Sequence, residues 1–318
     1  MSLRVIIGED VGKENVERLR ARFPEVSFAL AFTRDELIAR AADADVIFTK
    51  NVPAAAIERA SDLRWLQAGV AGVDGILANG LLHHPALLTC ARGAHGVSMS
   101  EHILAMMFAL ANRVPTLVEG RMTRQRVRQE VIHQKWQLEG QTIGIVGLGD
   151  VGGTLARKSK ALGLVVFGVR RGNEPFPGID GLYARDSLPE LLPRLDHIAL
   201  CLPGTAETRH VLGRREIALL KPNACVYNVG RGSAIDQEAL IEALRARHIA
   251  GAGLDVSTPD PPTEDSPLWD LPNVILGQHT SGHSPTNHYQ ITTIFADNLA
   301  RFLSNQPLLN LVDKERGY

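Results

Sequence analysis

Three glycines near the middle of the chain have the spacing that phosphate binding requires. Gly147, Gly149 and Gly152 form a G-x-G-x-x-G pattern between an apolar, β-branched run and a helix that Gly163 can end. The first glycine permits a tight turn, the second lets the backbone approach a pyrophosphate, and the third lets helix and strand pack closely. The N–H groups at the start of the helix would meet the phosphates. We predict a dinucleotide site here; the alternative is a glycine-rich turn without a ligand.

Two arginines end the strand that follows this helix. Sites for NAD usually place Asp or Glu at this position, where the carboxylate accepts hydrogen bonds from the ribose hydroxyls, but this chain has Arg170 and Arg171. A guanidinium can bind a 2′-phosphate through charge-assisted hydrogen bonds, whereas a carboxylate would repel it. We therefore expect NADP(H) as the preferred cofactor. NAD(H) is the alternative, in which case the two arginines are only solvated beside the adenine.

Further polar residues follow later apolar runs. Arg231, Asp255 and His279 each come at or just after the end of a predicted strand. Ligands of open α/β sheets bind outside the carboxyl ends of the strands, so this placement predicts one common site. Taken singly, each residue has a structural alternative, namely a surface arginine, a turn cap and a hydrogen-bonded histidine. Residues 69–74, also after a strand, can cradle a carboxylate with backbone N–H groups or form an ordinary turn.

Strand-like and helix-like segments alternate along the whole chain, which is typical of parallel sheets covered by helices. The predicted strands share short apolar runs and are residues 3–8, 26–30, 45–49, 64–68, 87–90, 142–146, 164–169, 197–202, 224–229, 250–254 and 273–276. The predicted helices share apolar periodicity or end signals and are residues 13–23, 33–42, 99–111, 150–162, 236–247 and 286–302, with another opened by Pro53. Thr33 with Glu36, and Ser98 with Glu101, form two expected capping boxes.

The segment after the apolar helix 99–111 is charged. That helix is apolar nearly all round, so we expect it to be buried between layers or between subunits. Four arginines of the segment lie close together in sequence: Arg121, Arg124, Arg126 and Arg128. A nucleic-acid patch is one interpretation, but Glu119 and Glu130 interrupt it. We favour a solvated helix face or a dimer-facing arm.

The composition limits the classes of function. With 318 residues the chain is long enough for two domains. Its 34 basic and 35 acidic residues nearly balance, so there is no net positive charge to attract nucleic acid or an anionic membrane. Cys90, Cys201 and Cys225 are widely spaced in apolar runs, as expected of free thiols in a reducing compartment. The first ten residues do not resemble a signal peptide, and no apolar run could span a bilayer. We expect a cytoplasmic protein without nucleic-acid or membrane partners.

Several segments together resemble the D-isomer-specific 2-hydroxyacid dehydrogenases. The similarity covers essentially the whole chain, in the order and spacing of that family, and is greatest for its glyoxylate/hydroxypyruvate reductase-like members. The segments that carry it are GIVGLGDVGGTLA, LCLPGTAETRH, VYNVGRGSAIDQEAL, AGAGLDVSTPDPP, SPLWDLPNVILGQHTSG and LLNLVDKERGY.

The resemblance implies roles for individual residues. Arg231 matches the arginine that binds the carboxylate and carbonyl of the substrate, for which a planar guanidinium is suited. His279 matches the catalytic acid/base, and Ala71 and Gly72 match backbone donors to the substrate carboxylate. Expected cofactor contacts lie in the glycine-rich turn and at later strand ends: Gly147, Gly149, Asp150, Val151, Gly152, Arg170, Arg171, Pro203, Val229, Gly230, Asp255 and Gly282.

One position departs from the family pattern. The family has Glu five residues after the aspartate of its L-D-V motif, whereas this chain has Asp260. A carboxylate there would orient His279 and favour its protonated form, and Asp is one methylene shorter. Glu264 and Asp265, on the same loop, are the alternatives. His283 and His288 lie near His279 in sequence, but Gly282 and Pro285 interrupt helical spacing, and we predict no metal site.

Together, the pattern and the resemblance predict an α/β protein of two doubly wound parallel-sheet domains. A Rossmann cofactor domain, residues 99–285, is expected as an insertion in a flavodoxin-like substrate domain, residues 1–98 and 286–318. The expected function is hydride transfer between NADP(H) and a small 2-keto or D-2-hydroxy acid, in a homodimer. The alternative is an NAD(P)-sensing interaction protein of the same fold with little catalysis.

Overall fold

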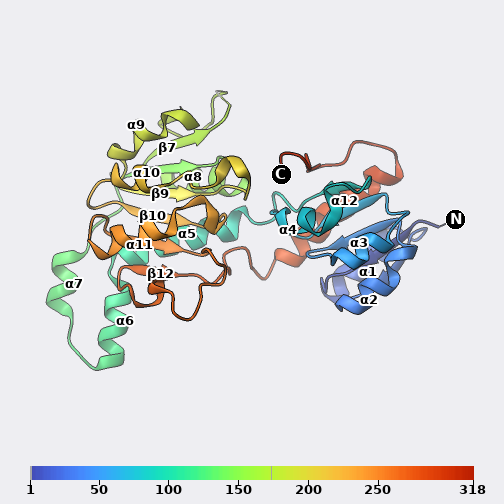
Figure 1. Cartoon of the computed structure of the whole chain (residues 1–318), viewed down its shortest axis with the longest axis horizontal. Coiled ribbons are helices and arrows are strands. Elements are labelled where there is room, and N and C mark those ends of the chain that lie inside the picture. Colours follow the sequence, from blue (N-terminus) through green and yellow to red (C-terminus); the bar gives the residue numbers. More distant parts are fainter. Residues whose placement is uncertain (1, 173) are drawn as a thin grey trace. The chain divides into compact units, whose positions relative to one another are not determined.

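The computed structural model describes residues 2–172 and 174–318, and the chain divides into two compact units (Figure 1). Unit 1 comprises Met1–His95 and Ser284–Tyr318, and unit 2 comprises Gly96–His283. The boundaries expected from the sequence, after residue 98 and before residue 286, lie three and two residues from these bounds. Unit 1 is therefore built from both ends of the chain.

Unit 1 contains a five-stranded parallel sheet in the order β2-β1-β3-β4-β5. This is the flavodoxin-like order, and the fold expected of the first domain is confirmed. The strands are β1 (Arg4–Ile7), β2 (Ser27–Leu30), β3 (Val46–Thr49), β4 (Trp65–Ala68) and β5 (Leu87–Thr89). Because both faces are covered, β3 and β4 are buried along their whole length.

Helices cover both faces of this sheet. One face holds α1 (Lys13–Arg22) and α12 (Asn287–Leu303), and the other holds α2 (Arg34–Arg40) and α3 (Ala54–Arg59); the short α4 (Asp74–Ile76) follows β4. Phe295 of α12 stacks on Phe48 with ring centroids 4.4 Å apart and on Trp65 at 5.4 Å. The C-terminal helix thus completes the core of unit 1, as predicted. The capping box of Thr33 and Glu36 is also confirmed.

Unit 2 contains a seven-stranded sheet in the order β12-β11-β10-β9-β6-β7-β8, parallel throughout. The order reverses between β6 and β9, as in the Rossmann fold that was predicted. The strands are β6 (Thr142–Val146), β7 (Val165–Arg170), β8 (Gly181–Ala184), β9 (His197–Leu200), β10 (Cys225–Asn228), β11 (Gly251–Leu254) and β12 (Val274–Leu276). The apolar pattern does not predict β8, which is a short, half-exposed edge strand with little apolar signal.

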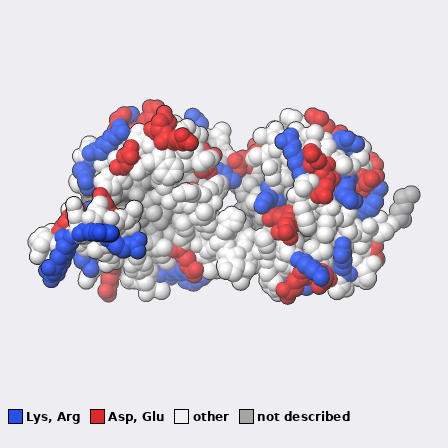
Figure 2. All heavy atoms as spheres, turned by 90° about the horizontal axis from the view of Figure 1, so that it is seen from below, with Lys and Arg blue, Asp and Glu red and all other residues white. Residues whose placement is uncertain are grey.

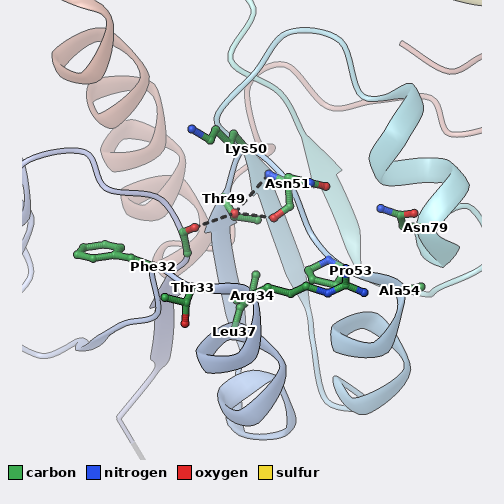
Figure 3. Close-up of a pocket in the computed structure, with 11 residues that line it drawn as sticks. Phe32, Thr33, Arg34, Leu37, Thr49, Lys50, Asn51, Pro53, Ala54 and Asn79 are labelled. Carbon is green, nitrogen blue, oxygen red and sulfur yellow. Dashed lines mark hydrogen bonds between the residues drawn. The ribbon is translucent and has the colours of Figure 1, made fainter. Parts of the chain in front are cut away.

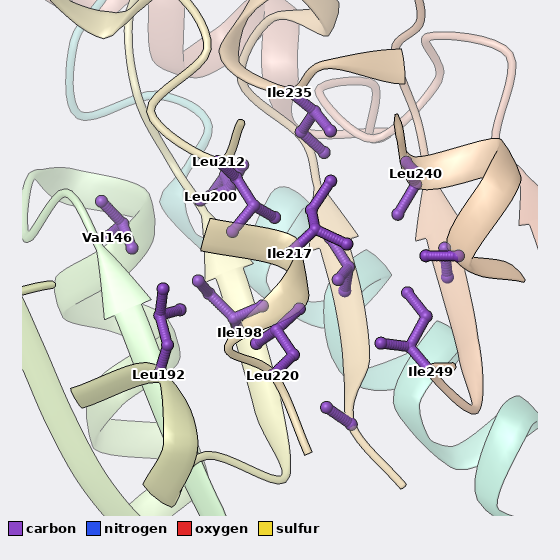
Figure 4. Packing of buried hydrophobic residues seen from close by; sticks show 14 of the residues in the cluster. Val146, Leu192, Ile198, Leu200, Leu212, Ile217, Leu220, Ile235, Leu240 and Ile249 are labelled. Carbon is purple, nitrogen blue, oxygen red and sulfur yellow. The ribbon is translucent and has the colours of Figure 1, made fainter. Parts of the chain in front are cut away.

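Two helical layers enclose this second sheet. The helices α5 (Gly96–Ala111) and α8 (Asp150–Ala161) cover one face, whereas α9 (Leu188–Leu191), α10 (Arg214–Ala218) and α11 (Gln237–Arg245) cover the other. Figure 4 shows the second layer, where Ile198 and Leu200 of β9 face Ile217 and Leu240 of the helices. The three cysteines are free thiols; Cys90 and Cys225 are buried, and Cys201 is half-buried.

The helix α5 begins earlier than predicted, and the capping box at Ser98 is wrong. Gly96 already lies within the helix, so Ser98 is not its N-cap. The carboxylate of Glu101 accepts a hydrogen bond from Lys158 Nζ of α8 at 2.8 Å. The buried side of α5 packs on the sheet of unit 2, which explains its apolar character.

The charged segment forms an arm of two helices, α6 (Val114–Thr123) and α7 (Arg128–Gln134) (Figure 1). Figure 2 shows Lys and Arg gathered on this arm and mixed charges over the rest of the visible face. Leu117 and Met122 are 45% and 75% exposed, so α6 also presents apolar side chains. In the described chain no single helix is long and apolar enough to cross a membrane, although α5 and α6, bent by 64°, have that length and composition together.

Candidate active site

The glycine-rich turn lies at the point where the strand order of unit 2 reverses. Gly147 has φ 96°, a backbone conformation that residues with a side chain rarely adopt. A Cβ on Gly152 would lie 1.9 Å from the carbonyl oxygen of Gly147, so close packing of α8 on the turn requires a glycine. A Cβ on Gly149 would meet no protein atom within 4 Å. The protein itself does not demand a glycine there, which fits a position left open for a ligand to approach the backbone.

The start of α8 suits an anion such as a pyrophosphate. This helix has twelve residues, and the first N–H groups of any helix have no partner within it. Asp150 and Val151 occupy its first turn, with Val151 half-buried. The carboxylate of Asp150 lies against Gly96, where an added Cβ would come within 2.5 Å of it. The turn and helix therefore have the form that a dinucleotide requires.

The two arginines after β7 already have carboxylate partners. Arg170 Nη2 lies 3.0 Å from Glu174 Oε2, and Arg171 Nη1 lies 3.0 Å from Glu207 Oε2. Both glutamates are exposed, at 84% and 61% of their side chains, so these ion pairs are weak and easily exchanged. The arginines are at the strand end where the adenosine ribose of a dinucleotide would lie. The 2′-phosphate of NADP(H), a dianion, would take the place of one of these carboxylates beside the arginines.

The loops after β6, β9, β10 and β11 touch one another in turn. A Cβ on Gly147 would lie 2.6 Å from the carbonyl oxygen of Cys201, which directly follows β9. A Cβ on Gly230 would lie 2.4 Å from the carbonyl oxygen of Leu202, beside Pro203. A Cβ on Gly232 would lie 1.9 Å from the carbonyl oxygen of Ser257. These close approaches bring the predicted cofactor and substrate residues of unit 2 to one edge of its sheet.

Arg231 is held at the end of β10 by main-chain contacts. Its Nη1 donates to the carbonyl oxygen of Gly230 at 2.9 Å, and its own carbonyl oxygen accepts a hydrogen bond from Asn228 Nδ2. The same Asn228 side chain accepts a hydrogen bond from the Gly230 N–H at 3.0 Å. Val229 and Gly230 are buried, and Arg231 is half-buried. The main chain that carries the Arg231 guanidinium is therefore fixed at the end of β10.

Asp255 anchors the loop that carries His279. Its side chain has no exposed surface, and its carboxylate accepts the N–H groups of Thr280 at 2.9 Å and Ser281 at 3.1 Å. Its carbonyl oxygen accepts the N–H of His279 at 2.6 Å. The carboxylate of Asp255 is hydrogen-bonded within the protein. The cofactor contact expected from Asp255 stays a prediction.

His279 is hydrogen-bonded to Asp260. The ring Nδ1 lies 2.7 Å from Asp260 Oδ2, and the two side chains are 55% and 28% exposed. Of the three carboxylates that the sequence left as alternatives, Asp260 is the one with a described contact to His279. The shorter Asp side chain therefore reaches the imidazole. His279 has φ 57°, so the loop holds it in a backbone conformation rare for a residue with a side chain.

In unit 1, the predicted substrate donors also follow a strand end. Ala71 is exposed and Gly72 half-exposed, in the turn after β4. Glu9 is 7% exposed and lies two residues after β1. It is not among the site residues predicted from the sequence, although a polar residue close to a strand end is a usable signal. A Cβ on Gly69 would lie 2.1 Å from Glu9 Oε2, so the carboxyl group lies against the start of that turn. Burial raises the pKa of Glu9 to about 7, although Lys50 opposes this.

A hollow opens in unit 1, lined by residues that follow β1, β2 and β3 (Figure 3). Its volume is about 390 Å³, and polar side chains of Arg34, Asn51 and Asn79 help to line it. In Figure 3 the Arg34 side chain reaches toward Pro53. Among the described residues no group of three or more His, Cys, Asp or Glu is placed to hold a metal ion.

Comparison with known proteins defines the class. A family model described as the NAD binding domain of D-isomer specific 2-hydroxyacid dehydrogenases matches residues 104–281, more than half of the chain. The chain belongs to the D-isomer specific 2-hydroxyacid dehydrogenase family, which confirms the resemblance seen in the sequence.

Individual relatives are reductases and dehydrogenases. The chain is 31% identical to glyoxylate/hydroxypyruvate reductase B of Pectobacterium atrosepticum, over 92% of this chain and 90% of that protein. It is also 31% identical, over 97% of its length, to D-3-phosphoglycerate dehydrogenase of Methanocaldococcus jannaschii, but spans only 59% of that protein. An NADPH-dependent glyoxylate/hydroxypyruvate reductase of Sinorhizobium meliloti, solved with NADP and sulfate, has a TM-score of 0.86 at 26% identity, covering 99% of this chain and 100% of that one.

Proposed function

We propose that this protein transfers a hydride between a nicotinamide cofactor and a small 2-keto or D-2-hydroxy acid of the glyoxylate or hydroxypyruvate kind. The observation that carries the proposal is the contact of His279 Nδ1 with Asp260 Oδ2 at 2.7 Å, at the same sheet edge as Arg231 and the glycine-rich turn. Two relatives named glyoxylate/hydroxypyruvate reductases support the substrate class.

Each residue has a defined task in this proposal. A bound nicotinamide supplies or accepts the hydride. His279 gives a proton to the oxygen of the keto acid during reduction and removes it in the reverse direction, for which an imidazole is suited. Asp260 fixes the ring through Nδ1, which leaves the other ring nitrogen for the substrate. Arg231 binds the substrate carboxylate and carbonyl, with Ala71 and Gly72 as further donors to the carboxylate.

A turnover assay tests the proposal. Purified protein is mixed with NADPH and glyoxylate, hydroxypyruvate, pyruvate or phenylpyruvate, and oxidation of the cofactor is followed by its absorbance. We expect turnover of at least one keto acid and its loss in His279→Ala. Tight NADPH binding without turnover of any keto acid would instead support a cofactor-sensing interaction protein.

We further propose NADP(H) as the preferred cofactor, with Arg170 and Arg171 as the binding residues for its 2′-phosphate. Their carboxylate partners are exposed and can be exchanged for the phosphate. In Arg170→Ala, the KM for NADPH should rise by about tenfold, the effect of one charge-assisted hydrogen bond, with that for NADH nearly unchanged. Equal use of both cofactors by the wild-type protein would contradict this assignment.

We also propose a homodimer in which the arm of α6 and α7 contacts a second copy. Side chains of Leu117, Val118, Met122 and Ile132 are all more than two-fifths exposed on this arm. The arm carries glutamates among its arginines, so two copies can be complementary in charge. Sedimentation analysis should show a dimer in the wild type and a monomer in Leu117→Asp/Met122→Asp. A wild-type monomer at micromolar concentration would refute the proposal.

The remaining inference concerns location. We place the protein in the cytoplasm, without nucleic-acid or membrane partners, because its cysteines are free and its basic arm is interrupted by acidic residues. Burial raises the pKa values of Cys201 and Cys225 to about 12, so neither is suited to thiolate chemistry. Fractionation of cells that express a tagged chain would test the location, and recovery with membranes would contradict it.

A further inference from the structure

A histidine on α5 faces the loop that carries His279. The Nε2 atom of His102 is buried, and in the described structure it has no hydrogen-bond partner. It lies 3.6 Å from Asp255 Oδ1, just beyond hydrogen-bond range. A Cβ on Gly277 would come within 2.7 Å of this nitrogen and 2.5 Å of Asp255 Oδ1. Because Gly277 has no side chain, α5 with His102, the carboxylate of Asp255 and the loop before His279 can pack in contact.

The contacts of Asp255 connect this histidine to the proposed catalytic one. The carboxylate accepts the N–H groups of Thr280 and Ser281, and the main chain of the same residue accepts the N–H of His279. Gln278 and His279 have φ of 55° and 57°, so two successive residues are in a conformation that their side chains disfavour. Such a loop persists only when its surroundings hold it, and Asp255 provides three of the bonds that do so.

We propose that His102 is a positioning residue for the reaction: by binding the buried carboxylate of Asp255, it fixes residues 277–281 and hence the place of His279. The inference rests on the proposed function. A movement of a few tenths of an ångström would let Nε2–H donate to Oδ1, which gives the buried carboxylate a third donor.

Charged groups on neighbouring elements of the described chain have other contacts. On α8, which packs against α5, Lys158 is paired with Glu101 of α5 at 2.8 Å. Asp150 of α8 lies against Gly96, at the start of α5. From the loops, His279 is paired with Asp260. Among the described contacts, His102 Nε2 is the side-chain nitrogen that lies beside the Asp255 carboxylate.

The test compares three variants of the full chain. His102→Leu removes the donor, and His102→Gln restores one of similar reach. His248→Leu is the matched control, because His248 also has a buried Nε2 without a partner in the described structure but follows α11. The readouts are amide exchange of residues 277–283 by mass spectrometry, and kcat and KM for keto-acid reduction with NADPH.

We expect faster exchange of the loop in His102→Leu, and a kcat lowered by about tenfold or more, because small misplacements of a catalytic group are costly. The KM for the keto acid should change little, since Arg231 is on another loop. His102→Gln should restore most of the kcat and most of the slow exchange of the loop. His248→Leu should resemble the wild type in both. If His102→Leu does not fold, His102→Asn, which is too short to reach Asp255, replaces it.

The outcomes separate the two proposals. A wild-type protein without turnover would refute the proposed function, whereas the exchange comparison needs no turnover and still tests whether His102 holds the loop. Unchanged exchange in His102→Leu would overturn the positioning role, whatever the rate. Faster exchange with an unchanged kcat would overturn its part in the reaction, and failure of Gln to recover kcat would overturn the donor argument.

Discussion

The buried carboxyl group of Glu9 should make unit 1 less stable as the pH rises. Glu9 is 7% exposed, and its Oε2 is buried without a hydrogen-bond partner in the described structure. Burial therefore disfavours the charged form and raises the pKa to about 7 from 4.5, against the opposing effect of Lys50. The change Glu9→Gln keeps the shape of the protonated acid but cannot ionise, which isolates this effect.

The direction and size follow from proton linkage. The folded state holds the proton more tightly than the unfolded state, so the contribution of Glu9 is fully present below pH 4.5 and is lost as the pH rises through 7. The gap between these pKa values corresponds to about 3 kcal/mol, reached when the group is ionised in both states. At about pH 8.5, Glu9→Gln should be more stable than the wild type by up to this amount. The two proteins should be alike near pH 4.5.

Urea unfolding with a probe inside unit 1 measures this difference. Trp65 is buried in unit 1, so its fluorescence reports on that unit in a Trp136→Phe/Trp269→Phe background. The probe must be local because a chain of two units need not unfold in one step. Glu58→Gln, an exposed position of α3, is the control. Parallel stability curves for wild type and Glu9→Gln across this pH range would refute the reasoning.

Three further predictions concern unit 2. Gly152→Ala should weaken NADPH binding by more than about tenfold in a fluorescence titration, because its Cβ would lie 1.9 Å from a carbonyl oxygen of the turn and would displace it; unchanged affinity would contradict the proposed cofactor site. Asp260→Asn should slow keto-acid reduction at neutral pH by about tenfold, whereas Asp260→Glu should retain activity; an unchanged pH–rate profile in the Asn variant would remove Asp260 from the mechanism. Burial lowers the pKa of His197 from 6.5 to about 4, so its stabilising contribution is present above pH 6.5 and is lost as the pH falls toward 4. His197→Gln should therefore flatten the acid dependence of urea unfolding followed by Trp136 and Trp269, by up to about 3 kcal/mol, and an unchanged dependence would contradict this.

The sequence by itself determined the architecture, because the signals for it are local. Alternating apolar runs and helices predicted both parallel sheets, and Gly147 and Gly152 have the backbone conformation and the close packing that their spacing indicated. The capping box at Thr33 was predictable for the same reason, since both partners lie within one helical turn. At Ser98 the same pattern failed, because the helix already begins at Gly96 and Ser98 lies within its first turn.

Only the tertiary structure decided how the site is assembled. Nothing local distinguishes Asp260 from Glu264 as the partner of His279, since the choice depends on how the loops after β11 and β12 meet. Likewise, the burial of the polar atoms of Glu9 and His102 depends on residues distant in sequence, such as Gly69 and Asp255. The energy of a buried polar group depends on which atoms surround it in space, and the order of residues along the chain does not contain that information directly.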